Sequence, residues 1–251
     1  MTTVLVVAHP GHELRLSAWV RRTRPTVFVT ARGSRSGRSE ARIAASHAVV
    51  ETLGGAAGEP FGAACDIDLY AAIMARDPTL FLALADTLRD AFASVATVVA
   101  DGWQNYNPVH DLTHLIARVA AAEAGSRFLD YPVVLGGLAH APDGPLAEVI
   151  DLSPDELSEK HTLIARYPEI AEDVAGLTAA AGDAAFARET LHRPLPLGEL
   201  LPTTTPPWYE IWGEGRVAAG IYAECLRWSH MAPIVAALSA RLEAVPMEMR
   251  R

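Results

Sequence analysis

Near its N-terminus the chain reads Val4-Leu5-Val6-Val7-Ala8-His9-Pro10-Gly11-His12-Glu13, an apolar run followed by two histidines in a Pro-Gly loop. A short apolar run rich in β-branched valine, ended by loop-forming residues, is typical of a buried strand. Both imidazoles then stand just beyond the carboxyl end of that strand. Because open α/β sheets bind their ligands at this edge, the stretch predicts a functional site as well as a fold class.

The first half of the chain alternates short apolar runs with longer segments of helical period. Strands are predicted over residues 4–7, 26–30, 97–100 and 133–135, and helices over residues 14–21, 40–53, 78–94 and 111–124. This alternation is typical of an α/β fold with a Rossmann-like, mostly parallel sheet and flanking helices. The runs are apolar throughout, as expected for strands that are covered on both faces.

Strand signals fade after Gly136, so the C-terminal third is expected to be helical. Ser153-Pro154-Asp155-Glu156 predicts the capped start of a helix that continues past Tyr167 with a kink at Pro168. A proline-rich surface crossing is expected over residues 194–207. Two closing helices are predicted over residues 215–228 and 233–242.

Composition limits the class of protein. The 251 residues, half of them hydrophobic, suffice for one domain over residues 1–251. A formal net charge of −9 disfavours nucleic acid as a partner, and no run is long and apolar enough to span a membrane. Two cysteines outside any CxxC pair, without a signal-peptide pattern, favour a cytoplasmic setting. The expected partner is a small-molecule substrate, and the formation of a homo-oligomer stays open.

Three of the nine histidines are spaced as metal ligands would be. His9 and His12 follow the first strand, and His110 follows the strand that ends near residue 101. Because parallel strands open onto the same edge, the three imidazoles are expected to converge, and imidazole nitrogen is a preferred zinc donor. The competing interpretation is that His9 and His12 are solvent-facing loop residues.

Two motifs resemble the signatures of a known family. The LmbE/PIG-L family of zinc-dependent N-deacetylases has Ala-His-Pro-Asp-Asp-Glu after its first strand and His-Pro-Asp-His before a later helix. This chain has Ala-His-Pro-Gly-His-Glu at residues 8–13 and Asn-Pro-Val-His at residues 107–110. The resemblance is clearest over residues 4–55 and 97–125, and it implies the family's α/β fold and a Zn²⁺ cofactor.

The resemblance also implies roles for individual residues. His9 and His110 match zinc ligands of the family, and His12 stands where the family has an aspartate ligand. A histidine there remains a competent zinc donor, because zinc accepts imidazole nitrogen as readily as carboxylate oxygen. Arg42 matches a family arginine and is expected to point toward the substrate.

The motifs depart from the family at the positions that handle protons. The family's general base, the first Asp of its signature, is Gly11 here, and the leading His of its second motif is Asn107. The ligand positions are therefore retained while both proton-handling groups are missing. If the family geometry persists, Asp at position 11 is expected to raise a hydrolytic rate by about 10² to 10⁴-fold.

Several residues are candidates to replace the missing groups. Asp101, at the end of its strand, and Asp111 and His114, beside His110, are each expected to act as a base or to orient a ligand. The same orienting role is open to Glu13. Asn107, with Tyr106, is a candidate donor to a developing oxyanion.

Substrate contacts are expected from two further regions. The loop over residues 32–38 carries three arginines, which suit a carboxylate, a phosphate or sugar hydroxyls, although a solvated loop is the competing interpretation. The aromatic and acidic segment over residues 208–214 is interpreted either as a helix-packing corner or as a pocket wall. In the second case, Tyr209 and Glu210 join Arg42 and Tyr106 in binding a polar substrate.

The leading functional hypothesis is a zinc-dependent hydrolase of the N-deacetylase type that acts on a small N-acylated metabolite or amino sugar with an altered catalytic base. One alternative keeps the metal and the fold but changes the reaction to that of a lyase, isomerase or transferase in a specialised biosynthetic pathway. Another is a non-catalytic protein that binds a ligand or a partner.

Overall fold

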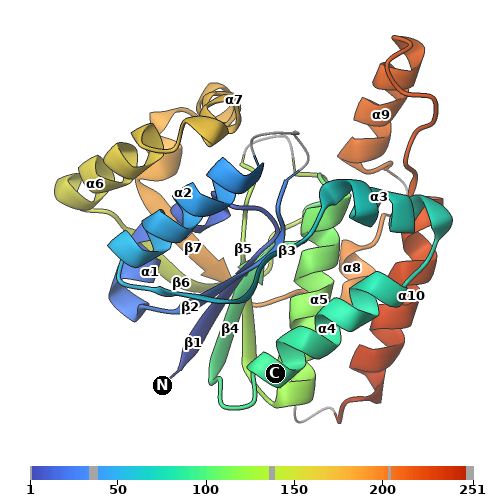
Figure 1. Cartoon of the computed structure of the whole chain (residues 1–251), viewed down its shortest axis with the longest axis horizontal. Helices are drawn as coiled ribbons and strands as arrows, with labels where there is room; N and C mark the ends of the chain where they lie inside the picture. The colour runs from blue at the N-terminus through green and yellow to red at the C-terminus, as the bar shows by residue number, and fades with distance from the viewer. Residues whose placement is uncertain (1, 34–38, 136–138, 203–204, 247–251) are drawn as a thin grey trace.

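Seven strands form one sheet at the centre of the structure, a computed structural model that describes residues 2–33, 39–135, 139–202 and 205–246 (Figure 1). The strands are β1 (Thr3–Val7), β2 (Thr26–Ala31), β3 (Ala56–Ala64), β4 (Thr97–Asp101), β5 (Arg127–Tyr131), β6 (Leu146–Asp151) and β7 (Arg188–His192). They lie in the order β3-β2-β1-β4-β5-β7-β6. The first five strands are parallel, and β7 and β6 are antiparallel additions, which confirms the predicted mostly parallel α/β fold.

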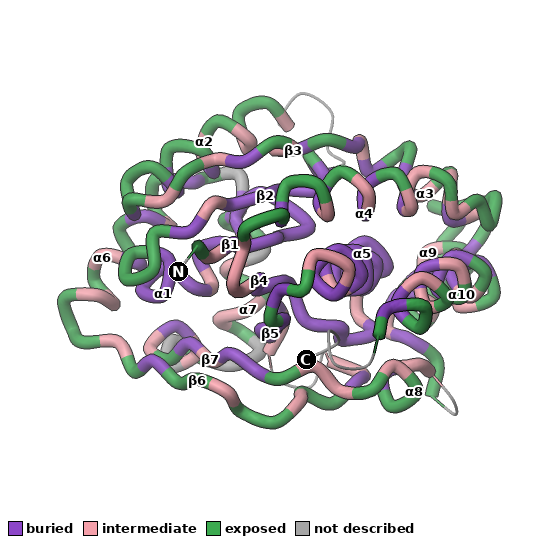
Figure 2. The backbone as a smooth tube through the Cα atoms, turned by 90° about the horizontal axis from the view of Figure 1, so that it is seen from below, coloured by how far each residue is buried: buried purple, intermediate pink, exposed green. Residues whose placement is uncertain are grey.

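Helices cover both faces of the sheet (Figure 2). One side carries η1 (His12–Leu16), α1 (Ser17–Thr23), α2 (Ser39–Thr52) and α6 (Pro154–Ala165), and the other carries α3 (Asp66–Ala75), α4 (Thr79–Ala91), α5 (Pro108–Ala124) and α10 (Trp228–Ala244). The remaining helices are η3 (Pro168–Ile170), α7 (Ala171–Ala181), η4 (Asp183–Phe186), α8 (Leu197–Leu200) and α9 (Trp208–Ala218). The C-terminal region with α9 and α10 is helical, as predicted.

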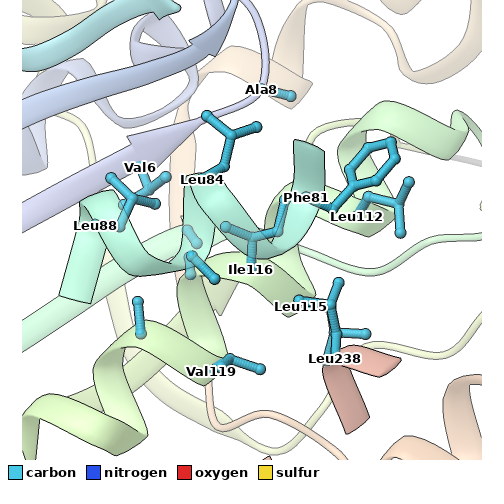
Figure 3. Close-up of a cluster of buried hydrophobic side chains, with 14 of the residues drawn as sticks. Val6, Ala8, Phe81, Leu84, Leu88, Leu112, Leu115, Ile116, Val119 and Leu238 are labelled. Carbon is cyan, nitrogen blue, oxygen red and sulfur yellow. The ribbon is translucent and has the colours of Figure 1, made fainter. Parts of the chain in front are cut away.

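The strand β1 explains why the protein has two hydrophobic cores. Successive side chains of a strand point to opposite faces. Val4 and Val6 join the core beneath α4, α5 and α10, which Figure 3 shows in close-up. Leu5 and Val7 join the core beneath η1, α1, α2 and α6. Because β1 is covered on both faces, its carboxyl end is held firmly in the middle of the sheet.

One predicted strand is misplaced. The structure has β5 at Arg127–Tyr131, and residues 133–135 form no strand. Instead, the side chain of Gln104 accepts hydrogen bonds from the backbone N–H groups of Val133 and Val134, both at 2.9 Å, and donates to the carbonyl of Val134 at 2.8 Å. A side-chain amide therefore satisfies backbone groups that a neighbouring strand would otherwise pair.

Three strands were not predicted, for two physical reasons. The edge strand β3 reads Ala-Ala-Gly-Glu-Pro-Phe-Gly-Ala-Ala and contains no β-branched residue, and its glycines and proline resemble a loop. The strands β6, Leu-Ala-Glu-Val-Ile-Asp, and β7, Arg-Glu-Thr-Leu-His, mix polar and apolar residues, which is unlike the continuous apolar runs of the central strands.

The predicted helix boundaries in the last third also need correction. The predicted capping box at Ser153 is present, but α6 ends at Ala165, and Pro168 begins the separate helix η3 rather than a kink. Proline disfavours helical backbone in the preceding residue, which accounts for the break. The helix predicted over residues 215–228 lies earlier, as α9, which ends before Gly220 with its positive φ of 70°. Among the described residues, no helix has both the length and the apolar character of a membrane span.

Candidate metal centre

Three histidines meet at the carboxyl edge of the sheet. His9 follows β1, His12 begins η1, and His110 lies in the first turn of α5. One nitrogen of each ring lies within 4.8 Å of the others, and Nδ1 of His9 is 3.2 Å from Nε2 of His110. His9 and His110 are buried, so the interpretation of His9 as a solvent-facing loop residue does not describe this structure.

The loop between β1 and η1 is held in a single shape. Gly11 has a φ of 106°, a left-handed conformation that favours glycine. The buried carboxylate of Glu13 accepts hydrogen bonds from the Gly11 N–H and from the Ser46 hydroxyl, both at 2.8 Å. The Nε of Arg42 donates to the carbonyl of Pro10 at 2.9 Å. Burial raises the pKa of Glu13, whose position makes it an anchor of this loop.

Asp66, in the first turn of α3, fixes the orientation of His9. Its two carboxylate oxygens lie 3.1 and 3.2 Å from Nε2 of His9, so Nδ1 is the nitrogen that faces the other histidines. Burial would raise the pKa of Asp66, but the hydrogen bond and charge of His9 hold it below its usual value. An ionised carboxylate behind an imidazole is the usual arrangement around metal-ligating histidines.

Asp101, the last residue of β4, fixes His12 in the same way. Its Oδ2 lies 2.8 Å from Nδ1 of His12 and accepts a hydrogen bond from the Ala8 N–H at 2.9 Å, while Oδ1 accepts from the Tyr131 hydroxyl at 2.6 Å. Nε2 of His12 is thus left to face the cluster. Burial and the neighbouring Asp101 raise the pKa of Tyr131, so the phenol stays a donor.

The donor set fits zinc. Desolvation is the main cause that lowers the pKa of His110 well below 6.5, and charge repulsion from His12 and His9 adds to it. The His110 imidazole is therefore neutral and offers a lone pair. Tetrahedral zinc with bonds of about 2.0–2.1 Å to nitrogen requires ligand atoms roughly 3.3 Å apart. The 3.2 Å separation of the His9 and His110 nitrogens already meets this requirement. We therefore treat the three histidines as a candidate Zn²⁺ site.

Substitution of Asp66 tests the orienting role. In Asp66→Asn we expect zinc affinity to fall by about 10–100-fold, because the amide no longer offers the paired carboxylate oxygens that hold His9. Competition with a chromophoric chelator measures the change. Asp68→Asn alters an exposed carboxylate of the same helix and is expected to bind zinc as the native chain does; equal affinities in both variants would contradict the assignment.

A cavity of about 620 Å³ adjoins the histidines. Its described wall includes two of the predicted substrate-binding residues, Arg42 and Tyr106. The ring of Tyr106 lies 6.3 Å from that of Trp208 at an interplanar angle of 9°, so the start of α9 supports it by stacking. Of the predicted arginine loop, Arg32 lines the cavity, whereas Arg35 and Arg38 lie outside the described residues.

The other two predicted substrate-binding residues are elsewhere. Neither Tyr209 nor Glu210 belongs to the described wall of the cavity. Tyr209 is buried in the core, and burial raises the pKa of its hydroxyl. Glu210 accepts a hydrogen bond from the backbone N–H of Trp228. Tyr209 therefore lies in the core, and Glu210 lies beside the start of α10.

The predicted proton-handling residues have fixed structural partners. Asp111 accepts hydrogen bonds from the backbone N–H groups of Gln104 and Asn105 at 2.9 and 3.2 Å, and burial raises its pKa to about 7. Nδ1 of His114 lies 3.1 Å from the carbonyl of Asp101, and desolvation lowers the pKa of its ring to about 3. Neither residue, nor Asp101, lines the described part of the cavity.

Asn107 does lie in the cavity wall, in a helix-capping position. Its side-chain oxygen accepts a hydrogen bond from the Val109 N–H at 2.9 Å, and Pro108 occupies the first helical position. This capping contact uses the oxygen and satisfies one free N–H of α5. The amide N–H₂ is the donor of Asn107, and the Tyr70 hydroxyl of the cavity wall is already a hydrogen-bond partner of this side chain.

The position of the family's base is closed by other side chains. A Cβ added to Gly11 would lie 2.7 Å from Cγ2 of Ile170 and 3.4 Å from Cε1 of Tyr167. The Tyr167 hydroxyl donates to the carbonyl of Arg42 at 2.6 Å, which fixes its ring. An aspartate at position 11 would therefore clash with Ile170 in this structure.

Asp66 is the functional residue that sequence reasoning missed. The signal was an acidic residue directly after a strand, in the sequence Cys65-Asp66 that follows β3. Because β3 contains glycine and proline in place of β-branched residues, neither the strand nor the acid at its carboxyl end was recognised.

The fold resembles solved deacetylase structures. The zinc-inhibited form of teicoplanin deacetylase Orf2 is 15% identical in sequence and aligns over 76% of this chain and 97% of its own, with a TM-score of 0.53. The A40926 pseudoaglycone deacetylase Dbv21 is 18% identical over 78% of this chain and 99% of its own, with a TM-score of 0.50. The chain shares their fold. No protein-family model matches the sequence, and no curated protein matches it.

Proposed function

We propose that the protein is a zinc-dependent hydrolase of the N-deacetylase type and a divergent relative of the LmbE/PIG-L family. The observation that carries the proposal is the convergence of three histidines, two of them held by carboxylates, on a cavity at the carboxyl edge of the sheet. The shared fold with zinc-associated deacetylases supports it. The proposed substrate is a small N-acylated metabolite.

His9, His12 and His110 would hold the zinc ion. When bound, zinc supplies a Lewis acid that polarises a carbonyl and lowers the pKa of water. Asp66 and Asp101 keep the far nitrogens of His9 and His12 protonated and aim the near nitrogens at the site. Arg42 and Tyr106 would orient the substrate from the cavity wall.

The handling of protons differs from that implied by the resemblance. Gly11 offers no side chain, and Asp66 and Asp101 are committed to imidazoles. Besides Asp66, the carboxylate in the described wall of the cavity is that of Glu172, on α7. The Asn107 amide and the Tyr106 hydroxyl are neutral polar groups of the wall at the second motif. We propose that this enzyme works without a dedicated aspartate base, so its hydrolysis is slower than that of a family member with one by about 10² to 10⁴-fold.

Metal content and acyl release test the proposal together. We expect the purified chain to hold about one zinc per molecule, because one set of three imidazole ligands is present in its described part. It should also release acetate from some members of a panel of N-acetylated sugars and amino acids. Chelation should stop the release, and zinc returned in small steps should restore it. Small steps are needed because a zinc-inhibited form exists for the similar teicoplanin deacetylase.

Two results would contradict the proposal. A chain that takes up no zinc is not a zinc enzyme. Acetate release that survives complete metal removal would show hydrolysis by another route. A chain that binds zinc but converts a substrate without releasing an acyl group would instead support the lyase, isomerase or transferase alternative.

A further inference from the structure

Arg15 lies in the cavity wall with buried donor atoms that have no acceptor. Its Nε and Nη1 receive no hydrogen-bond partner from the described residues. The other two arginines of the wall differ, since Nε of Arg32 donates to the Gly62 carbonyl at 3.1 Å and Nε of Arg42 to the Pro10 carbonyl at 2.9 Å. Buried N–H groups without an acceptor are destabilising, so the presence of two of them on one guanidinium beside a cavity points to a ligand.

The carboxylate whose charge acts on Arg15, that of Glu189, is already hydrogen-bonded to other groups. Glu189 accepts hydrogen bonds from the N–H groups of Ala18 and Trp19 at 3.1 and 2.9 Å and from Nζ of Lys160 at 2.8 Å. The same Lys160 ammonium donates to the backbone carbonyl of Arg15 at 3.1 Å. The charge of Glu189 therefore stabilises α1 and Lys160, and the Arg15 guanidinium stays available.

Arg15 lies on the same short helix as one of the three histidines, His12. His12 and Arg15 are three residues apart in the 3₁₀ helix η1. Side chains at this spacing share one face of a 3₁₀ helix and are separated by about 6 Å along its axis. An anion on Arg15 would therefore be held about one turn away from the histidines.

Apolar side chains share the cavity wall with Arg15. The Arg15 guanidinium carbon lies 6.0 Å from the centre of the Phe186 ring. The elements η1, α6, η3, α7 and η4 contribute the cavity-lining residues Leu14, Ile164, Ile170, Val174, Leu177 and Phe186. A surface of this kind suits hydrocarbon, and the Arg15 guanidinium beside it suits a planar monoanion held by two parallel hydrogen bonds.

We propose that Arg15 binds a carboxylate of the substrate, so that the substrate is an N-acetylated carboxylic acid whose hydrocarbon part lies on the apolar wall. The acetyl end of this assignment rests on the proposed function, whereas the carboxylate end rests on Arg15 alone. A carboxylate is favoured over a phosphate because a strongly hydrated dianion would lose more hydration among these apolar side chains.

Two probes of equal shape test the assignment: 4-acetamidobenzoate, which carries a carboxylate, and 4-acetamidobenzamide, which is neutral. Binding to the full chain is measured by calorimetry with zinc and after chelation. We expect the native chain to prefer the benzoate by about 10–100-fold in both states, the usual worth of a hydrogen-bonded charge. Arg15→Gln should bind both probes equally, and Arg15→Lys should keep part of the preference.

Arg127→Gln serves as the matched control, because it removes an exposed arginine at the start of β5. It should retain the native preference for the benzoate. If Arg15→Gln retains that preference as well, or if the native chain has none, the proposal is overturned. Tighter binding of 4-acetamidophenyl phosphate than of the benzoate would overturn the choice of a carboxylate.

The stability of Arg15→Met separates a binding role from a structural one. Removal of two buried N–H groups that have no acceptor should leave the melting temperature of the ligand-free chain unchanged or raise it. The benzoate should raise the melting temperature of the native chain but not that of the variant. A lower melting temperature for Arg15→Met without ligand would show that Arg15 stabilises the fold, and would overturn the proposal.

The outcomes for Arg15 and for the hydrolase can be distinguished. Binding of the benzoate through Arg15 without acetate release leaves this inference standing and removes the proposed function. Equal acetate release from the benzoate and the benzamide, unchanged in Arg15→Gln, leaves the hydrolase standing and removes this inference.

Discussion

His110→Ala should remove zinc from the protein. The residue supplies one of three converging imidazoles, and its Nε2 lies 3.2 Å from Nδ1 of His9. Substitutions that only disturb a ligand's orientation cost about 10–100-fold in metal affinity, so loss of the ligand itself should cost more than ~100-fold. Mass spectrometry after dialysis against a competing chelator should find about one zinc in the native chain and almost none in the variant.

A second measurement makes this result independent of catalysis. A ligand that binds only the folded chain stabilises it by about 2.7 kcal/mol at 100 times its dissociation constant. Zinc should therefore raise the melting temperature of the native chain and leave that of His110→Ala unchanged. His47→Ala, which removes an exposed histidine of α2, is the control and should respond to zinc as the native chain does. A normal zinc response of His110→Ala would mean that the metal binds elsewhere.

Gly11→Asp should destabilise the protein rather than activate it. The left-handed backbone at φ 106° costs a residue with a side chain about 1–2 kcal/mol. The new Cβ would lie 2.7 Å from Cγ2 of Ile170, and overpacking of this kind costs about 1–3 kcal/mol. The summed loss of about 2–5 kcal/mol corresponds to a melting temperature lower by roughly 5–15 °C for a chain of this size.

The control for this prediction is Gly215→Asp. Gly215 lies on α9 with nothing within 4 Å of an added Cβ, so an aspartate there should change the stability little. Ile170→Ala removes the steric clash but empties a core position, which alone costs about 2–5 kcal/mol. Gly11→Asp combined with Ile170→Ala should therefore lose less stability than the sum of the two single variants. An unchanged melting temperature in Gly11→Asp, or faster acetate release, would show that the loop and η3 can move apart and that the family geometry is within reach.

The central strands of the sheet and the convergence of the three histidines could be predicted from the sequence for the same reason. The strands β1, β2 and β4 are covered on both faces, so they appear as apolar runs, and the residues that follow them must lie at one edge. Topology alone then brings His9 and His110 together, although about one hundred residues separate them along the chain.

The edges of the sheet and the surroundings of the histidines could not be predicted in this way. The strands β3, β6 and β7 are defined by their pairing partners more than by their own side chains. Asp66 depends on β3 for its position, so it was missed together with that strand. The contact of Ile170 with the Gly11 position depends on how η3 packs against the loop, which no local pattern encodes.

The carboxylate of Asp101 has a consequence for how the metal would bind. It accepts hydrogen bonds from the Ala8 backbone and the Tyr131 hydroxyl and also pairs with His12, so one side chain connects the loop after β1 with β5 and η1. The imidazole is consequently immobilised when the sheet forms, and the entropy of ordering it is lost during folding rather than during metal uptake. Such a preorganised centre is expected to keep its cooperative unfolding transition after chelation, unlike small zinc domains that are unfolded without their metal.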